Sequence, residues 1–264
     1  MKKLLSIILA ALICISCVAC TTPEEDGNEL DNYTPPATTF KISTGTLTFK
    51  DGPAESAIIT AYQPSPEYAT KKHEVVIPDV INEREVSAIG AEAFYFQNLV
   101  TSVKLPSSVE YIDDFAFAGC TALASIEIPE SVERIGEFAF QGCTALTKVT
   151  FAGNALQSIE NMAFNDCSTL SDIVLPEGLI SIGNQSFGYC VSITEMVMPK
   201  TLKVIGNLAL YGCSGLNAEG ALTLTASIEE IGEFAFEGIN KEYIKAPEGS
   251  YAAEYVSEMF ESAN

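Results

Sequence analysis

From Val86 onward, apolar and polar residues follow a pattern that returns after little more than twenty residues. The pattern begins anew at residues 86, 109, 132, 156, 179, 202 and 228, so successive starts lie 23 to 26 residues apart. The hexapeptide IGEFAF occurs at 135–140 and again at 231–236, and IDDFAF occurs at 112–117. A catalytic signature would need one copy, whereas self-similarity at a fixed period indicates a solenoid of stacked units.

Each unit is predicted to combine a short strand, a stop and a corner. Ile126 and Ile128 are two residues apart and therefore point to one face of a strand. Pro129 ends that strand because it has no N–H to donate. Ala139 and Phe140 are expected to point inward at the following corner. No unit can bury its apolar face alone, so stacking must create the core. The corners predict one buried spine of Phe94, Phe117, Phe140, Phe164, Phe187, Leu210 and Phe236.

The consensus of the units, roughly V-x-x-I-G-x-x-A-F-x-x-C-x-x-L-x-x-I-x-I-P, resembles the BspA-like leucine-rich repeats of the treponemal type. The resemblance implies a β-rich, right-handed solenoid of about seven 23-residue units over residues 86–247. The preceding stretch HEVVIPDVINEREVSAIG looks like the family's lead-in strand, and residues 248–264 are similar to its C-terminal capping helix. Residues 40–85 are then expected to form an N-terminal β cap, in which TLTFK and AIITAYQ flank the turn-former DGP.

Several units depart from this consensus. The third has Ala152 where Pro is usual, and the second and fourth have Asp113 and Glu160 at the Gly position. If that Gly marks a turn with positive φ, Asp113 is tolerable there and Glu160 is strained or remodelled. The sixth unit carries a three-residue insertion near Asn217–Gly220. Insertions in solenoids project as loops, so this one is a candidate binding element.

The first twenty residues differ from the rest of the chain. Lys2 and Lys3 precede an apolar run at 4–19 that is short for a membrane span, which is typical of an export signal. Because the run ends in cysteine, it looks like a bacterial lipoprotein signal. Cys20 is the preferred lipid anchor, since a polar acidic stretch follows it, and Cys17 is the alternative. A simple secretory signal with incidental cysteines is a further reading.

Residues 21–39, TTPEEDGNELDNYTPPATT, contain almost no large aliphatic side chains. Such a segment cannot bury enough surface to order itself, so it predicts a flexible tether. Its acidic residues 24–26 resemble the stretch that follows the anchor in surface lipoproteins of Bacteroidetes-type cells; an ordinary solvated linker is the alternative. Together, signal and tether predict an exported protein, anchored by lipid to the bacterial outer membrane and exposed at the surface.

Composition excludes some partners. The chain has 14 basic and 35 acidic residues, for a net charge of −21, and this charge repels nucleic acids and anionic lipid surfaces. Membrane contact is therefore expected through the lipid anchor only. Hydrophobic residues make up 47% of the chain and charged residues 19%, which is enough apolar surface for a packed domain core. The domain is expected to be a monomer.

Nothing in the motifs indicates catalysis. No phosphate-binding glycine loop, nucleophile elbow or zinc-protease motif occurs, and the single histidine, His73, is assigned to the surface or the cap. A glycosidase-like carboxylate pair could hide among the acids, but nothing singles out two. The sequence thus predicts no enzyme, no cofactor and no metal. The five cysteines outside the signal share one repeat position and are predicted to be buried small hydrophobes, because parallel stacked side chains suit a disulfide poorly: Cys120, Cys143, Cys167, Cys190 and Cys213.

The exposed residues of the stacked strands are the predicted ligand face. They form two columns: Ser102, Ser125, Lys148, Asp172, Glu195, Ala221 and Tyr243, and Lys104, Glu127, Thr150, Val174, Val197, Thr223 and Lys245. Val174 and Val197 would form an apolar patch rimmed by Asp172 and Glu195, as at a protein-binding surface. The alternative is that β-branched residues simply suit strands. The candidate ligand face is Lys148, Thr150, Asp172, Val174, Glu195, Val197 and Tyr243.

These observations predict a binding protein. Its partner is expected to be an extracellular protein or a glycan. A protein is favoured because Tyr243 is the only aromatic residue in the two columns and tryptophan is absent. The family resemblance implies adhesion, which is an argument by analogy because fold does not fix function. The alternative is a glycan-binding or scaffolding lipoprotein of an outer-membrane nutrient-uptake complex.

Overall fold

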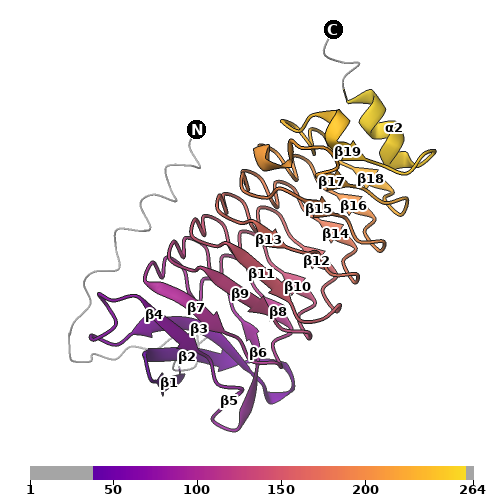
Figure 1. Cartoon of the computed structure of the whole chain (residues 1–264). Helices are drawn as coiled ribbons and strands as arrows, with labels where there is room; N and C mark the ends of the chain where they lie inside the picture. Colours follow the sequence, from indigo (N-terminus) through magenta and orange to yellow (C-terminus); the bar gives the residue numbers. More distant parts are fainter. Residues whose placement is uncertain (1–37, 260–264) are drawn as a thin grey trace, which may run out of the picture. The chain divides into compact units, whose positions relative to one another are not determined.

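The structure, a computed structural model, describes residues 38–259. The predicted signal, Cys17, Cys20 and nearly all of the predicted tether lie outside the described residues. From residue 73 onward the chain winds in stacked coils, and successive coils place parallel strands side by side in two ladders (Figure 1). The predicted β-rich solenoid is confirmed.

The N-terminal end of the stack is covered by a small antiparallel arrangement of β1 (Thr38–Ile42), β2 (Gly45–Asp51) and β3 (Ala57–Pro64). The predicted turn at DGP is there, and a short 3-10 segment, η1 (Pro53–Glu55), follows it. Strand β3 pairs in parallel with β6 (Arg84–Ile89), so the sheet of the cap continues into the first ladder of the repeats. The cap therefore pairs the sheet edge that the first coil would otherwise leave open.

The first ladder consists of very short strands. Each ends with a buried isoleucine that packs into the core, and β5 (Val80–Ile81) pairs with β6 at its side. Beyond β6 its members are β8 (Tyr111–Ile112), β10 (Arg134–Ile135), β12 (Ser158–Ile159), β14 (Ser181–Ile182), β16 (Val204–Ile205) and β18 (Glu230–Ile231).

The second ladder carries the predicted ligand face, and we call it the strand face. Its members are β4 (His73–Val76), β7 (Val100–Lys104), β9 (Ser125–Ile128), β11 (Lys148–Phe151), β13 (Asp172–Ile173), β15 (Met196–Val197), β17 (Leu222–Thr223) and β19 (Ile244–Lys245). The first five strands form one sheet and the last three form another, and among residues 38–259 no strand pairing joins β13 to β15. The strand face is therefore interrupted between β13 and β15.

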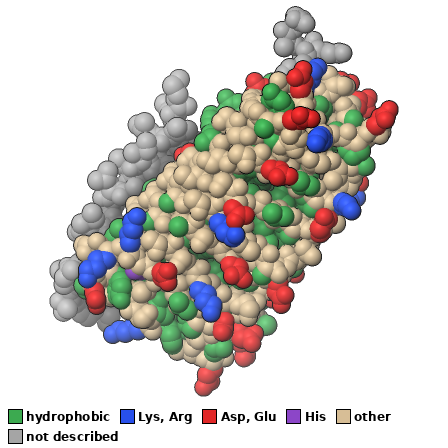
Figure 2. All heavy atoms as spheres, viewed as in Figure 1, with side chains coloured by type: hydrophobic (Ala, Val, Ile, Leu, Met, Phe, Trp, Pro, Cys, Tyr) green, Lys and Arg blue, Asp and Glu red, His purple; other side chains and the backbone are tan. Residues whose placement is uncertain are grey.

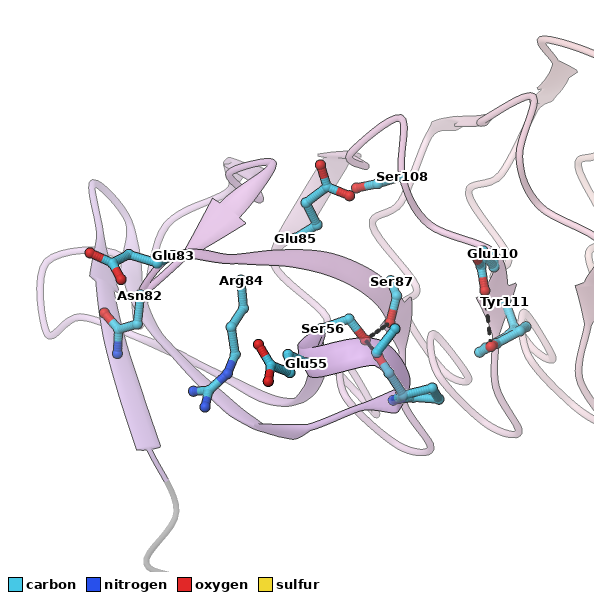
Figure 3. A pocket seen from close by; sticks show the side chains of 12 residues that line it. Glu55, Ser56, Asn82, Glu83, Arg84, Glu85, Ser87, Ser108, Glu110 and Tyr111 are labelled. Carbon is cyan, nitrogen blue, oxygen red and sulfur yellow. Dashed lines mark hydrogen bonds between the residues drawn. The ribbon is translucent and has the colours of Figure 1, made fainter.

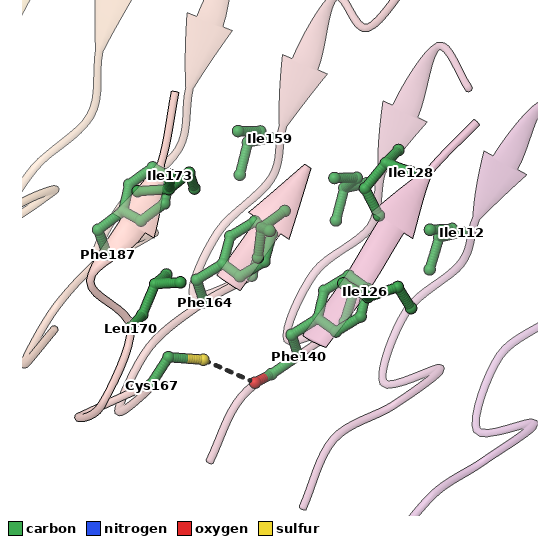
Figure 4. Close-up of a cluster of buried hydrophobic side chains, with 14 of the residues drawn as sticks. Ile112, Ile126, Ile128, Phe140, Ile159, Phe164, Cys167, Leu170, Ile173 and Phe187 are labelled. Carbon is green, nitrogen blue, oxygen red and sulfur yellow. Dashed lines mark hydrogen bonds between the residues drawn. The ribbon is translucent and has the colours of Figure 1, made fainter. Parts of the chain in front are cut away.

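The predicted aromatic spine runs through the core (Figure 4). All seven predicted spine residues are fully buried. From Phe94 to Phe187, successive rings stack with centroids 5.0 to 5.4 Å apart. Tyr62 of the cap stacks on Phe94 at 5.3 Å, and Tyr255 meets Phe236 edge-on at 5.8 Å. The spine thus ends against an aromatic ring from each cap, so neither terminal coil exposes its apolar face.

The five cysteines form a second buried column beside the spine. Each thiol donates a hydrogen bond to the carbonyl of the phenylalanine in the preceding coil, as Cys167 does to Phe140 at 3.2 Å (Figure 4). All five thiols are free and buried, as predicted for small hydrophobes. Burial raises the pKa of the Cys120 and Cys213 thiols to about 12 and raises the pKa of the other three well above its usual value.

The corners between the ladders are also hydrogen-bonded, although they contain no assigned strand. Three backbone N–H groups of each corner donate to carbonyls of the next coil, at 2.7 to 3.1 Å, from residue 92 through to residue 237. In the coil of Phe138, these donors are residues 138, 140 and 142. The alternate N–H groups, at 139, 141 and 143, close turns onto the residue three positions earlier. Every corner is thereby tied to its neighbours.

The glycine of IGEFAF has a different role from the one considered above. Gly136 does not have positive φ; a Cβ there would instead lie 2.7 Å from the Asp113 carbonyl carbon of the preceding coil. Close approach of two coils therefore favours glycine. Glu160, at the equivalent position, is likewise not in the left-handed region. Positive φ occurs two residues after this position, at Phe138 (57°), and again at Gly142 (69°).

The two ends are fixed by side-chain hydrogen bonds. His73, predicted for the surface or the cap, is buried at the start of β4 against Tyr62 of the cap, with Nε2 2.9 Å from the Tyr62 hydroxyl and Nδ1 2.9 Å from the Lys71 carbonyl. At the other end, η3 (Lys241–Tyr243) and β19 lead into the predicted capping helix, α2 (Tyr251–Glu258). The Ser250 hydroxyl caps this helix by accepting from the Ala253 N–H at 3.2 Å.

Candidate ligand-binding face

Strand pairing places the predicted columns side by side. Ser102, Ser125, Lys148 and Asp172 are register partners on β7, β9, β11 and β13, and Val197, Thr223 and Lys245 are partners on β15, β17 and β19. Their inward-pointing neighbours, such as Val149 and Met196, are buried. The alternation read from the sequence therefore correctly separates core from surface on these strands.

Most of the predicted ligand face is exposed. Lys148, Thr150, Asp172 and Glu195 are exposed, and Val174 and Val197 expose 78% and 53% of their surface. Lys148 Nζ lies 2.6 Å from Asp172 Oδ2, which links two neighbouring coils across the face. The two valines follow or end β13 and β15, the strands between which the sheet is interrupted. The apolar patch therefore lies at the break in the strand face.

Two residues of the columns differ from expectation. Ala221 is buried rather than exposed, because it lies directly after the inserted residues and before β17, where the chain enters the core. Tyr243 is half-buried and ends the 3-10 segment η3 instead of lying on a strand. The C-terminal end of the strand face therefore exposes fewer of the predicted column residues than the sequence suggests.

A shallow hollow of about 600 Å³ extends the strand face toward the N-terminal cap. It lies over β7 and β9, and Lys104, Glu127 and Pro129 are among the residues that line it. Seen from the direction of Figure 1, acidic, basic and hydrophobic side chains are interspersed over the coils (Figure 2). The surface around the strand face is therefore mixed in character, as is common at protein-binding surfaces.

A second hollow, of about 550 Å³, lies at the N-terminal cap (Figure 3). Glu55, Glu83, Glu85 and Glu110 contribute four carboxylates to its lining, and Arg84 contributes one cation that also pairs with Asp51 at 3.3 Å. Like charges dominate, and residues 38–259 contain no group of three or more His, Cys, Asp or Glu side chains arranged to hold a metal ion. The residues that line this hollow therefore do not indicate a metal or catalytic site.

The insertion in the sixth unit is tied to its neighbour. Asn217 Nδ2 donates to the Gly238 carbonyl at 2.9 Å, and Asn217 Oδ1 accepts from the Asn240 N–H at 2.8 Å. Short segment η2 (Ser214–Leu216) leads into it, and Leu216 is buried. Its role in binding stays a prediction.

Sequence reasoning missed the aromatic residues of the corners. Phe138 and Phe140 are two positions apart, as on one face of a strand, but Phe140 is buried whereas Phe138 is partly exposed. Positive φ at Phe138 turns its side chain away from the core. The signal was present in the sequence: FAF places two large aromatic residues around one alanine, more apolar volume than one corner needs. Which of the two phenylalanines points outward depends on the backbone conformation, and the sequence does not show it.

Comparison with known proteins also identifies leucine-rich repeats in this chain. Residues 87–217 match the model of the BspA type leucine rich repeat region in six copies. The comparison with curated proteins gives no match. Among residues 38–259, no helix has the length and apolar character needed to span a membrane.

Several solved structures are similar. The T. pallidum leucine rich repeat protein is 29% identical with a TM-score of 0.67, over 81% of this chain and 93% of that one. A leucine-rich repeat protein from Bacteroides ovatus is 26% identical (TM-score 0.62), over 76% of this chain and 57% of that one. A leucine rich cell surface protein from Faecalibacterium prausnitzii is 24% identical (TM-score 0.63), over 81% and 55%. With the repeat period, the spine and the family match in agreement, the repeats of this chain belong to the BspA type of leucine-rich repeats.

Proposed function

We propose that this protein is displayed on the bacterial cell surface and binds an extracellular protein through its strand face. It acts by recognition and not by catalysis. Cys20, or alternatively Cys17, carries the lipid that anchors it to the outer membrane. The signal-like residues 1–20 and the similarity to the leucine rich cell surface protein of F. prausnitzii support the location.

One observation carries the binding proposal. Val174 and Val197 are 78% and 53% exposed on a face where β9 and β11 show polar side chains such as Glu127 and Thr150, and Asp172 and Glu195 lie beside them. Exposed apolar side chains inside a polar rim gain free energy when a partner covers them. The coils beneath are tightly packed, so the face is preorganised and little ordering is needed on binding.

The binding test compares matched variants. The purified chain is measured by interferometry against panels of purified extracellular proteins and of polysaccharides. For any protein that binds, V174S/V197S is expected to weaken the complex about tenfold or more, as hot-spot truncations do. The control is I180S, which removes an aliphatic side chain that is 41% exposed but lies outside the strand face. Equal affinities for the double variant and the control would refute the strand face as the site, and binding of polysaccharides alone would favour the glycan-binding alternative.

Location is tested separately on intact cells of the native host. Protease is added to living cells, and the mass of the released fragments is measured. Release of the domain from living cells is expected for a surface protein. Protection until the envelope is broken would contradict surface display and favour a scaffold inside the outer membrane. Radiolabelled fatty acid, followed in C20A and C17A variants, identifies the anchor.

A further inference from the structure

The corners of the repeats form a second exposed surface, distinct from the strand face. We call it the corner ridge: the outward-facing residues of segments 90–97, 113–120, 136–143, 160–167, 183–190, 206–213 and 232–239. Its exposed or partly exposed aromatic residues include Tyr95, Phe96, Phe115, Phe138, Tyr189 and Phe234. Phe96 and Phe234 are 57% and 61% exposed. The core does not need these rings, because the buried spine already fills it.

These rings lie close to one another on neighbouring coils. Phe115 and Phe138 stack with centroids 4.6 Å apart and an interplanar angle of 6°. Tyr95 meets Phe96 edge-on at 4.4 Å and Phe115 edge-on at 6.3 Å. At least four rings therefore form one continuous aromatic strip over the first three corners. Farther along, Tyr189 meets Tyr211 edge-on at 5.2 Å and forms a second such site.

The backbone at the rings is held in an unfavourable conformation. Phe96 and Tyr189 have φ of 54° and 61° at a position where other coils have glycine, for example Gly119 and Gly142. Residues with a side chain pay a free-energy cost in this left-handed region that glycine does not. Strained backbone under exposed side chains is a mark of functional surfaces. The coils that use glycine show that the fold itself does not require a ring there.

Charge on the ridge has a single sign. The seven segments contain eight acidic residues and no lysine or arginine: Glu92, Asp113, Asp114, Glu137, Glu160, Asp166, Glu233 and Glu237. Arg134, which reaches Asp113 and Asp114 from β10 at 3.0 and 3.7 Å, is the neighbouring cation that pairs with them. The strand face, by contrast, alternates Lys104, Lys148 and Lys245 with acidic residues. The ridge therefore attracts cations, and its charge disfavours a second copy of this chain or a nucleic acid.

We propose that the corner ridge binds a lysine- and arginine-rich segment of another protein. Guanidinium and ammonium groups are attracted to the faces of aromatic rings and to carboxylates, and the ridge interleaves the two. A neutral glycan would use the rings but gain nothing from the acids. This second site is independent of the strand face, so either proposal can fail while the other stands.

The first test removes rings without changing charge. F96G and Y189G place glycine where four other coils have it, so the fold is expected to persist. The probe is a fluorescein-labelled peptide of alternating arginine and glycine, and its affinity for the purified full chain is measured by fluorescence anisotropy. The double variant F96G/Y189G is expected to weaken binding about fivefold or more, given the strength of exposed cation–π contacts. The control, Y251A, removes an exposed ring of α2 outside the ridge and should leave affinity unchanged.

The second test changes charge at matched sites. E92Q/E137Q on the ridge should weaken peptide binding several-fold and flatten its dependence on salt, because each lost carboxylate removes an attraction that salt screens. E74Q/E127Q changes net charge equally on the strand face and should have little effect. Equal losses for both pairs, with no effect of ring removal, would show unspecific attraction and overturn the proposal. Ring-dependent binding of a neutral oligosaccharide together with no binding of the peptide would also overturn it.

Discussion

The strand face and the corner ridge differ in how the coils are joined and in what they expose. The strand face consists of short strands but is interrupted between β13 and β15, and it exposes aliphatic side chains together with charged side chains of both signs. The ridge has no assigned strand, yet three backbone hydrogen bonds join each pair of neighbouring corners without interruption. The corner segments thus join the coils through at least as many backbone hydrogen bonds as the short strands do. Because these bonds fix the backbone, the ridge can keep aromatic side chains exposed.

The same contrast exists within one hexapeptide. In IGEFAF, Phe140 belongs to the buried spine and Phe138 to the ridge, only two residues away. The inner side of a corner therefore contributes stability and its outer side contributes surface chemistry. Four predictions separate these contributions, from the largest expected effect to the smallest.

The largest effect is expected from the buried thiols in alkaline solution. Because burial raises their pKa, to about 12 for Cys120 and Cys213, they stay protonated in the folded chain while those of the unfolded chain ionise above about pH 9. Their contribution to stability is complete below that pH and is lost as the pH rises, by about 1.4 kcal/mol per pH unit for each thiol. Urea unfolding between pH 8 and pH 10.5 measures this loss.

The matched control for that measurement is C213A. The variant has one thiol fewer to ionise on unfolding. The free energy of unfolding should therefore fall less steeply with pH, by about 1.4 kcal/mol per pH unit. An unchanged slope would mean that the thiols are accessible to solvent in the folded chain.

The second prediction compares the two phenylalanines directly. F140A removes a spine ring stacked between Phe117 and Phe164 and should lower the free energy of unfolding by about 3–5 kcal/mol. F138A removes a partly exposed ring and should cost about 1 kcal/mol or less. Urea unfolding of both variants gives the difference. Similar losses would show that the ridge ring belongs to the core, and this would weaken the case for a binding surface.

The third prediction concerns a ladder of asparagine side chains within the ridge segments, in which each side-chain oxygen accepts a hydrogen bond from a backbone N–H of the next coil. Asn184 Oδ1 accepts from the Asn207 N–H at 2.7 Å, and Asn161 Oδ1 accepts from the Asn184 N–H at 2.8 Å. N184A should cost about 1 kcal/mol because the Asn207 N–H loses its partner. N184D keeps the acceptor and should recover most of that loss in thermal unfolding. If both variants behaved alike, the ladder would not contribute to stability.

The smallest effect is expected on the strand face. Lys148 and Asp172 form an ion pair at 2.6 Å, but their side chains are 53% and 57% exposed. Water and salt screen such pairs, so K148A should change the free energy of unfolding by about 0.5 kcal/mol or less. A loss as large as that of N184A would contradict the view that the strand face is a surface for binding and adds little to stability.

Sequence reasoning succeeded where a side chain position repeats in every coil. The spine from Phe94 to Phe236, the buried cysteines and the inward isoleucines all follow from the period and from simple alternation. Ala221 was missed because the insertion before it disturbs the period in that coil. The break after β13 was missed because the 23-residue period continues through it and gives no sign of the lost strand pairing. Phe138 was missed for another reason: its direction depends on a positive φ that all seven corners adopt at this position, and no corner has a glycine there to mark it.

Beyond the cap, the hydroxyl and thiol hydrogen bonds between coils share a direction along the chain. Cys167 donates to a carbonyl of the preceding coil, and the hydroxyls of Ser131, Thr201 and Ser227 do the same. A chain that emerges N-terminus first can therefore lay each coil onto one already formed, and every such donor finds its acceptor in place. Growth from the cap would sequester each thiol as its coil docks, before the next cysteine is available to react with it. The order of synthesis then protects five thiols that are free and buried in the finished fold.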